Sequence, residues 1–389
     1  MIRYLFIFII LSFSSSYAQD WTQIGDFPES KRDDGVSFKI GNIAYFGTGL
    51  DESFTTQNDF FAFDLSTEIW TTIQNLPSTA NRQYATASGF NNKGYVFGGT
   101  VGGVYLNDLW LYDALLDTWE ELESLPGEGR AGASNFILNN QWFIVGGKNS
   151  SGVALNEVWK YDFSSGLWSQ MSNIPNLGMW RGMAFSYNNV GYVGLGQDAN
   201  DALNSDFWEY DFSLDSWLLS SWSMTPRIYP AYAQINGKVF VYGGVNSLSA
   251  FMNTFEAIDL GTNQLLDLGI FPSDARRGTM TIASNDAFYL TTGLIPTARM
   301  GETWKVSNIL SLEQIIEHSY EVVQVGSEIQ ILNVTSVQNF KLISITGKEV
   351  RGINNSKVLN VSTLKSGLYF YCFEKESRFF KGKIYLEKQ

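Results

Sequence analysis

The sequence predicts an all-β protein whose larger part is one four-stranded unit copied six times. A glycine recurs about every 49 residues in an equivalent context, at positions 49, 99, 147, 196, 244 and 293. Spacings inside the unit are also constant, because an aspartate precedes a tryptophan by six residues at Asp64, Asp113, Asp162 and Asp211. Self-similarity at a fixed period of this length indicates a repeated supersecondary unit.

The second copy illustrates the four strands expected in each unit. Its runs at 84–90, 94–97, 108–112 and 118–122 either alternate between apolar and polar residues or are wholly apolar, and turn residues separate them. Six such units in sequence, each with two faces to bury, favour a radial array of sheets.

The sixth copy lacks an outer strand of its own. After Gly293 it offers residues 302–305 as a third strand, but no tryptophan and proline follow at the usual spacing. Trp21 and Pro28, near the start of the chain, do have that spacing. Because an unpaired sheet edge exposes backbone donors and acceptors, we expect the N-terminal segment to pair with the last copy. The sequence therefore predicts a closed six-bladed β-propeller.

The repeated residues resemble the Kelch repeat. The second copy carries the double glycine in residues 96–99, Tyr112-Asp113 with Trp119 six positions on, and a crossing segment from Pro126 to Arg130. The resemblance covers roughly residues 20–308. Three copies interrupt the glycine doublet and the fifth lacks the tryptophan, at Thr48, Leu195, Thr292 and Leu265 or Leu266.

Most of the aromatic residues are expected to be packing residues. In a radial array the gap between neighbouring sheets widens towards the rim, and large flat rings fill it. This interpretation covers Trp70, Trp110, Trp119, Trp159, Trp168, Trp208 and Trp217.

Residues 1–18 read as an export signal. One cation, Arg3, precedes an apolar run over 4–11, and Ser16 and Ala18 are the small residues before a cut ahead of Gln19. The run is too short to span a bilayer, so the mature chain is expected to be exported without a transmembrane segment. Its one cysteine, Cys372, cannot form an internal disulfide.

The chain changes in composition after the propeller, which we place at residues 19–309. A linker at 310–325 contains the only histidine, His318, and the remaining residues 326–389 contain short strands and many lysines. Residues 1–310 carry a net charge of −15 and residues 311–389 carry +2, which together give the −13 of the whole chain. The tail is predicted to be a small Ig-like β-sandwich.

The tail resembles the C-terminal sorting domain of the type IX secretion pathway of certain Gram-negative bacteria. The matching segments occur in the expected order, at 340–350, 359–364, 365–370 and 379–386. An accessory sandwich without a sorting role is the alternative. The resemblance implies that the type IX machinery is a partner and that the protein is secreted or displayed at the cell surface, on the outer membrane.

Composition restricts the chemistry open to the propeller. Residues 1–310 contain no histidine, which excludes imidazole-ligated zinc or copper and any Ser-His-Asp or Cys-His arrangement. The loop 198–201 has oxygen-bearing side chains at alternate positions, as a calcium-binding loop would. The interpretation that we favour is a solvated polar turn. The net negative charge of the propeller argues against nucleic acid as a partner, because a phosphate backbone requires a cationic surface. We assign no catalytic residue, metal or cofactor.

Arginines near the crossing between copies are the candidate ligand-binding residues. Six of them are expected to form a ring around one mouth of the central channel, where they would either bind backbone carbonyls of the neighbouring unit or attract an anion. Tyr84, Trp180 and Tyr229 flank three of them and are expected to supply a stacking surface. The arginines are Arg32, Arg82, Arg130, Arg181, Arg227 and Arg276 or Arg277.

These observations lead to two functional hypotheses. The first is a binding module for a glycan or protein partner. The alternative is a carbohydrate-active enzyme of the sialic-acid mutarotase or epimerase kind, because a six-bladed Kelch enzyme of that activity is similar in fold and export and uses carboxylate and arginine groups. The two hypotheses differ in turnover, which anomer exchange measured by NMR would detect.

Overall fold

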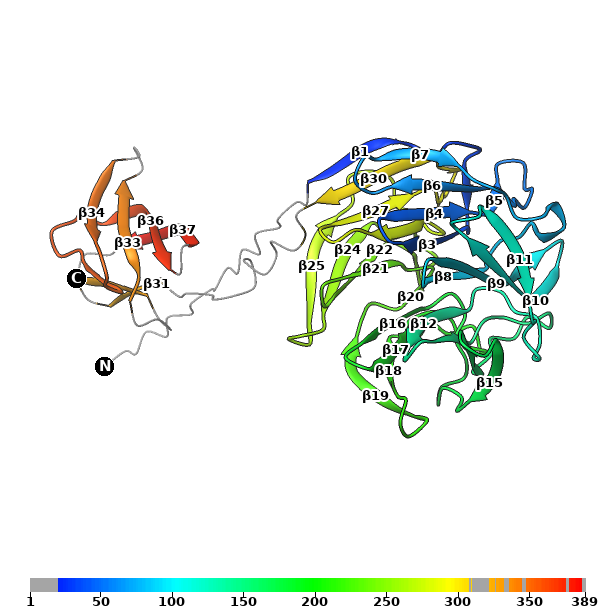
Figure 1. Cartoon of the computed structure of the whole chain (residues 1–389). Helices are drawn as coiled ribbons and strands as arrows, with labels where there is room; N and C mark the ends of the chain where they lie inside the picture. Colours follow the sequence, from blue (N-terminus) through cyan, green and yellow to red (C-terminus); the bar gives the residue numbers. More distant parts are fainter. Residues whose placement is uncertain are drawn as a thin grey trace. The chain divides into compact units, whose positions relative to one another are not determined.

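The computed structural model describes residues 20–307, 309, 322–325, 327–331, 336–344, 348–375 and 378–386. The chain divides into two compact units, residues 1–310 and 311–389, which are described separately below (Figure 1). The predicted export signal at 1–18, His318 and most of the predicted linker lie outside the described residues.

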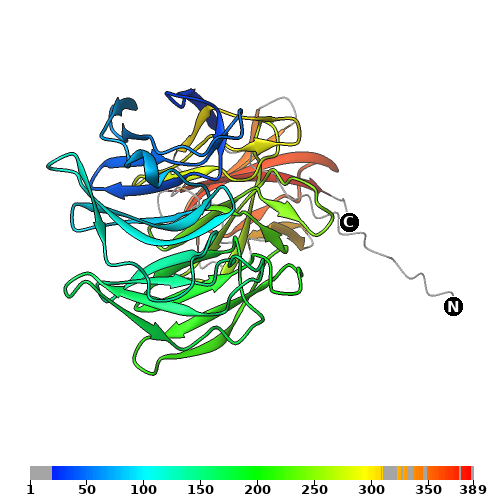
Figure 2. The same ribbon diagram turned by 90° about the vertical axis from the view of Figure 1, so that its right-hand side faces the viewer.

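Six four-stranded antiparallel sheets make up most of residues 20–307, the described part of the first unit (Figures 1 and 2). We number them as repeats 1 to 6 by their innermost strands, β3, β8, β12, β16, β21 and β26. Repeats 1 to 3 comprise β3 (Val36–Ile40), β4 (Ile43–Gly47), β6 (Phe60–Asp64) and β7 (Ile69–Thr72); β8 (Thr86–Phe90), β9 (Lys93–Val101), β10 (Val104–Asp113) and β11 (Thr118–Leu122); β12 (Ser134–Leu138), β13 (Gln141–Val145), β14 (Val158–Asp162) and β15 (Leu167–Met171).

Repeats 4 to 6 follow the same order from the innermost strand outward. They comprise β16 (Met183–Tyr187), β17 (Val190–Gly194), β18 (Asp206–Asp211) and β19 (Ser216–Ser223); β21 (Ala231–Ile235), β22 (Lys238–Tyr242), β24 (Thr254–Asp259) and β25 (Gln264–Ile270); β26 (Met280–Ala283), β27 (Ala287–Thr291), β30 (Glu302–Ser307) and β1 (Trp21–Asp26).

The N-terminal strand closes the propeller, as the spacing of Trp21 and Pro28 predicted. Strand β1 pairs antiparallel with β30, with Trp21 opposite Val306. The Trp21 ring lies 5.0 Å from the rings of Phe255 and Phe271 in repeat 5. On the inner side, β3 lies against both β8 and β26. The first and last repeats are therefore neighbours in a closed ring.

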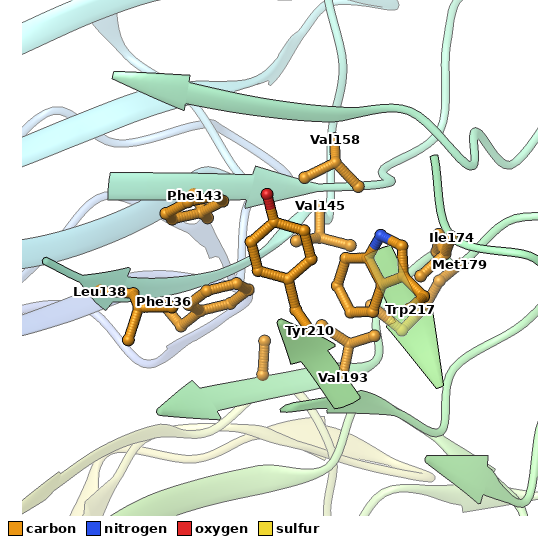
Figure 3. Close-up of a cluster of buried hydrophobic side chains, with 11 residues drawn as sticks. Phe136, Leu138, Phe143, Val145, Val158, Ile174, Met179, Val193, Tyr210 and Trp217 are labelled. Carbon is orange, nitrogen blue, oxygen red and sulfur yellow. The ribbon is translucent and has the colours of Figure 1, made fainter. Parts of the chain in front are cut away.

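Apolar clusters fill the space between neighbouring sheets. Figure 3 shows the cluster between repeats 3 and 4, in which Phe136 stacks on Phe143 at a centroid distance of 4.8 Å and Tyr210 contacts Trp217 at the same distance. The indole Nε1 of Trp217 donates to the Ser172 carbonyl oxygen at 2.8 Å. Trp119 and Trp168 make the equivalent bond to the preceding repeat. These tryptophans therefore join the sheets, as the repeat pattern predicted.

The glycine doublet links each repeat to the next. The Gly99 amide donates to the carbonyl oxygen of Arg130 at 2.8 Å, and Gly99 has a φ of 97°, where a Cβ would lie 2.7 Å from the Gln83 carbonyl oxygen. The first doublet position is also left-handed, even where it is not glycine. A left-handed backbone destabilises the fold by about 1–2 kcal/mol at each residue other than glycine. The three residues concerned are Thr48, Leu195 and Thr292, with φ values of 60°, 59° and 64°.

The second unit contains two antiparallel sheets. The first has the order β31-β32-β35 and the second β34-β33-β36-β37. Ile329 and Leu359 of the first sheet and Phe340 and Phe373 of the second belong to one buried cluster. Cys372 is half-buried, with a free thiol. The strands are β31 (Val322–Val325), β32 (Glu328–Ile331), β33 (Gln338–Ser344), β34 (Glu349–Ile353), β35 (Val358–Asn360), β36 (Gly367–Lys375) and β37 (Arg378–Leu386).

Candidate functional site

Five of the candidate arginines are buried structural residues with a common pattern of partners. Arg82 donates from Nε to the Ala80 carbonyl at 2.8 Å and from Nη1 to the Gly98 carbonyl at 3.0 Å. It also makes a bidentate ion pair with Asp108, at 2.8 and 2.7 Å. Such a pair fixes the strand that carries the carboxylate. Arg32, Arg130, Arg227 and Arg276 are equally buried and pair with Asp59, Glu157, Glu256 and Glu302.

Arg181 occupies a different position in its repeat. The Gly147 amide donates to the Met179 carbonyl at 2.8 Å, just as the Gly99 amide donates to Arg130, so Met179 stands where the other repeats have arginine. Asp206, at the place of the partner carboxylate, is exposed. The sequence grouped Arg181 with the five buried arginines, but the structure separates it from them by two residues.

Arg181 belongs instead to a ring of six residues around the propeller axis, which we call the axial ring. Each lies two residues after the position of the buried arginine and has a left-handed φ between 55° and 64°. Backbone hydrogen bonds connect successive members; for example, the Arg181 amide donates to Gly132 at 2.8 Å and the Tyr229 amide to Arg181 at 2.9 Å. The axial ring consists of Asp34, Tyr84, Gly132, Arg181, Tyr229 and Gly278.

The axial ring opens into a central cavity of about 530 Å³, which we call the axial pocket. Small residues of the six innermost strands line much of it, such as Ala87, Ser134 and Ala233. Lys39 also lines the pocket and donates from Nζ to the Ala283 carbonyl at 2.9 Å. Burial lowers the pKa of the Lys39 ammonium group. The pocket thus combines small wall residues with two cations, Arg181 and Lys39.

Three aromatic rings surround the Arg181 guanidinium. Its Cζ lies 3.6 Å from the ring centroid of Trp180, 3.8 Å from that of Tyr229 and 4.1 Å from that of Tyr84. The Arg181 side chain makes no hydrogen bond or ion pair to another described residue, and its Nε is buried without a partner. Burial lowers the pKa of Arg181 to about 10, so the group remains charged at neutral pH. The structure therefore brings together three candidates from the sequence, Tyr84, Trp180 and Tyr229, around the fourth.

The acidic residues near the ring have cationic partners of their own. Arg277 Nη1 lies 3.1 Å from a carboxylate oxygen of Asp34 and 3.5 Å from one of Asp33. Arg299 Nε donates to Asp33 at 2.5 Å. Burial, followed by the charge of Asp34, raises the pKa of Asp33 to about 7. Asp34 and Asp33 also stabilise the Arg181 charge from a distance, but their ion pairs are with Arg277 and Arg299, and Arg181 makes no ion pair among the described residues.

Lys148 is a further cation that the sequence reasoning missed. Its Nζ lies 4.3 Å from the centroid of the Trp180 ring. Lys148 directly follows the doublet of repeat 3, and its backbone pairs with Ala131, next to the axial-ring residue Gly132. The sequence signal was present, since Lys148 is the one cation that directly follows a doublet among the six repeats.

The loop at 198–201 is a polar turn. The Asp198 carboxylate accepts the backbone amides of Asn200 and Ala202 at 2.8 and 2.9 Å. Asp51, Asn149 and Asn246 make the same turn in other repeats. Within the described ranges, no group of three or more acidic, histidine or cysteine residues is placed to hold a metal ion. The same residues include no helix with the length and apolar content needed to cross a bilayer.

Family comparisons agree with this geometry. The model of the KLHDC2/KLHL20/DRC7 Kelch-repeats domain matches residues 5–183, and the Kelch motif model matches residues 226–264. The model of the secretion system C-terminal sorting domain matches residues 321–387. This chain is a Kelch-repeat protein with a C-terminal sorting domain. The sorting domain identifies an exported protein, secreted or at the cell surface, that uses type IX secretion.

A comparison with solved structures supports the fold of the Kelch-repeat protein. The structure described as "Structure of YjhT" has a TM-score of 0.61 and 15% sequence identity, over 71% of this chain and 95% of that chain. At this identity the similarity concerns the propeller fold alone. No curated protein matches the sequence.

Proposed function

We propose that this Kelch-repeat protein is a binding module whose axial pocket holds an anionic group of a glycan or protein partner. The observation that carries the proposal is Arg181, whose guanidinium is enclosed by three aromatic rings and makes no ion pair or side-chain hydrogen bond among the described residues. A charge withdrawn from water is costly unless a partner compensates it. The five buried arginines each have such a partner within the fold, which marks Arg181 as the exception.

The enclosure of Arg181 also indicates how an anion would bind. The rings of Tyr84, Trp180 and Tyr229 lie within 4.1 Å of the guanidinium carbon and Nε is buried, so we infer that an anion would approach the terminal nitrogens, Nη1 and Nη2. A planar carboxylate can accept two parallel N–H bonds from such an edge. Lys148 adds a second positive charge nearby. Both cations attract anions to a propeller whose overall charge is negative.

Direct binding measurements on the full chain would test the proposal. The probes are a fluorescein-labelled hexaglutamate peptide and a labelled trigalacturonate, followed by fluorescence anisotropy. Arg181→Ala should cost an acidic probe roughly 2–5 kcal/mol, and binding should weaken as salt rises. Arg181→Lys should recover only part of the affinity, since the ammonium lacks the planar edge. Binding unchanged in Arg181→Ala would refute the proposal.

Arg227→Met is the matched control for the arginine substitutions. Arg227 is buried and pairs with Glu256, so its removal should lower stability while the folded protein keeps its affinity. If Arg227→Met weakened probe binding as strongly as Arg181→Ala, the assignment of distinct roles to the two arginines would be wrong.

One observation favours the alternative, an enzyme of the mutarotase kind. The pKa of Asp33, raised to about 7 by burial and by Asp34, suits general acid–base catalysis near neutral pH; Asp33 itself is buried against Arg299, and its neighbour Asp34 is the carboxylate that lines the axial pocket. Anomer exchange in a panel of acidic sugars, followed by NMR, would detect this activity. Binding without exchange would favour the module.

The cellular setting of the proposal is the surface of a Gram-negative bacterium. The type IX sorting domain supports it, as do the signal-like residues at 1–18 of the sequence. Protease accessibility on intact cells would distinguish display on the outer membrane from release into the medium.

A further inference from the structure

Five exposed apolar side chains stand on loops next to the axial ring, four on the loops that follow the doublets of repeats 1, 2, 3 and 5 and one on the connection from repeat 3 to repeat 4. We call this set the apolar crown. Isolated exposed apolar residues are common on proteins, but their clustering around one site is typical of an interaction surface. The crown consists of Phe54, Val104, Val153, Leu177 and Leu248, which are 77%, 60%, 43%, 58% and 85% exposed.

The backbone pairing places two of these loops beside the ring. Strand β23 (Val245–Asn246) pairs with β20 (Arg227–Ile228), which ends just before Tyr229, and Leu248 follows β23. In repeat 1, β5 (Leu50–Asp51) pairs with β2 (Arg32–Asp33), which ends just before Asp34, and Phe54 follows β5. The Phe54 ring also lies 4.8 Å from Cζ of Arg299, the partner of Asp33.

The remaining loops are attached in the same way. Val104 lies at the tip of the β9–β10 hairpin, where Thr100 pairs with Gln83, next to Tyr84. The loop of Val153 follows Lys148, which pairs with Ala131. Leu177 accepts the amide of Ala199 in the repeat 4 loop, where Gln197 pairs with Trp180. Because the loops of repeats 1, 2, 3 and 5 share this register and Leu177 is bonded to the equivalent loop of repeat 4, we infer that the five side chains surround the same mouth of the axial pocket.

The aromatic rings at the mouth are occupied by cations. Arg181 and Lys148 both lie over the Trp180 ring, at 3.6 and 4.3 Å, and Arg181 and Arg277 both lie over the Tyr229 ring, at 3.8 and 4.3 Å. Sugar-binding aromatic residues need a free ring face on which the sugar can stack. These two rings instead hold the cations in place, so the mouth is suited to recognise charge.

From this combination we propose that the partner is a protein, which inserts an acidic side chain towards Arg181 and Lys148 and packs apolar side chains against the crown. The inference rests on the proposed function, since it identifies the kind of partner that the same pocket takes. A charged centre with unpaired cations selects the acidic group, and an apolar surround adds affinity by burying surface. An acidic glycan would use the centre but has few apolar groups for the crown.

Two matched peptides and one glycan would test the inference on the full chain by fluorescence anisotropy. Both labelled pentapeptides have a central glutamate, flanked on each side by two leucines in one and by two glycines in the other, and the glycan is trigalacturonate. We expect the leucine-flanked peptide to bind at least about tenfold more tightly than the glycine-flanked one. Leu248→Ser and Phe54→Ser should each reduce this advantage several-fold and leave the glycine-flanked peptide unaffected.

Leu115→Ser is the matched control, because Leu115 is 86% exposed but lies on the turn between β10 and β11. An equal loss in Leu115→Ser, or no advantage for leucine flanks, would overturn the inference. Trigalacturonate binding that depends on Arg181 and exceeds that of both peptides would identify an acidic glycan instead. In each of these cases the proposed role of Arg181 stands, whereas loss of the Arg181 dependence itself would remove the proposed function.

Discussion

The backbone amide of Gly293 donates to the carbonyl oxygen of Arg32 at 2.8 Å, which joins the last repeat of the propeller to the first. Five equivalent bonds join the other neighbouring repeats, from Gly49, Gly99, Gly147, Gly196 and Gly244. The sixth bond exists only because the N- and C-terminal parts of the first unit meet. Stability of the whole ring should therefore depend on residues near residue 20 as much as on residues near residue 300.

Deleting residues 20–28 should destabilise the first unit by several kcal/mol. The deletion removes β1 and the buried Phe27 ring, and loss of a buried aromatic side chain alone costs about 3–5 kcal/mol. All 12 tryptophans lie in the first unit, so tryptophan fluorescence during thermal unfolding reports on it selectively. The exposed Leu167, changed to alanine, is the control. A melting temperature within about 2 °C of the full chain would contradict closure by β1.

Replacing Arg130 with methionine, the residue at the equivalent position of repeat 4, should lower the free energy of unfolding by about 3–5 kcal/mol. Arg130 is buried and pairs with Glu157 at 2.7 Å, and the pairing lowers the pKa of that carboxyl against the opposing effect of burial. The double variant Arg130→Met/Glu157→Gln should recover part of the loss, because no uncompensated charge remains. Urea unfolding of the four members of the cycle measures this coupling, and additive losses would show that the pair does not act as a unit.

Gly98→Ala should be more destabilising than Gly102→Ala, although both glycines have a left-handed φ, 61° and 55°. A Cβ on Gly98 would lie 2.7 Å from the carbonyl oxygen of Arg130, whereas a Cβ on Gly102 meets nothing within 4 Å. Backbone strain of about 1–2 kcal/mol is common to both variants, so the difference between their unfolding free energies isolates the contact with the next repeat. Equal losses would mean that the doublet serves only to provide a turn.

The free energy of unfolding should fall as pH rises from about 4 to about 7, and one residue, Asp33, should account for this dependence. Burial and Asp34 raise the pKa of Asp33 from 3.8 to about 7. Over this range the folded chain retains a proton that the unfolded chain releases, so the unfolding free energy decreases with pH. Asp33→Asn should flatten this part of the pH profile, measured by urea unfolding at several pH values. A profile with the same slope in both proteins would rule out Asp33 as the source.

The spacing of residues was sufficient to predict the repeated sheets and the pairing of β1 with β30. These features follow from backbone periodicity, which is visible in one sequence. The role of Arg181 could not be predicted in this way. In the fourth copy the position of the buried arginine is occupied by Met179, and Arg181, two residues later, is easily mistaken for that arginine. Only the bond from Gly147 to Met179 fixes the register.

A sequence signal for the buried arginines did exist. Each is followed, 26 to 29 residues later, by the carboxylate that it pairs with, and Asp108, Glu157 and Glu302 stand two residues before a tryptophan whose Nε1 binds the same carboxylate. The axial pocket had no such signal, since it depends on where side chains point from a left-handed backbone. The crown and Lys148 likewise become neighbours of Arg181 only through the pairing of short strands.

The last prediction concerns the route of the protein out of the cell. Residues 311–389 form a compact unit with its own buried cluster, so removal of residues 326–389 should leave the propeller folded. The truncated chain should then accumulate in the periplasm, because it has lost the sorting domain that type IX secretion recognises. Fractionation of cells, with tryptophan fluorescence of the purified chain as the test of folding, measures both expectations. Truncated protein in the medium or on the cell surface would show that the propeller carries an export address of its own.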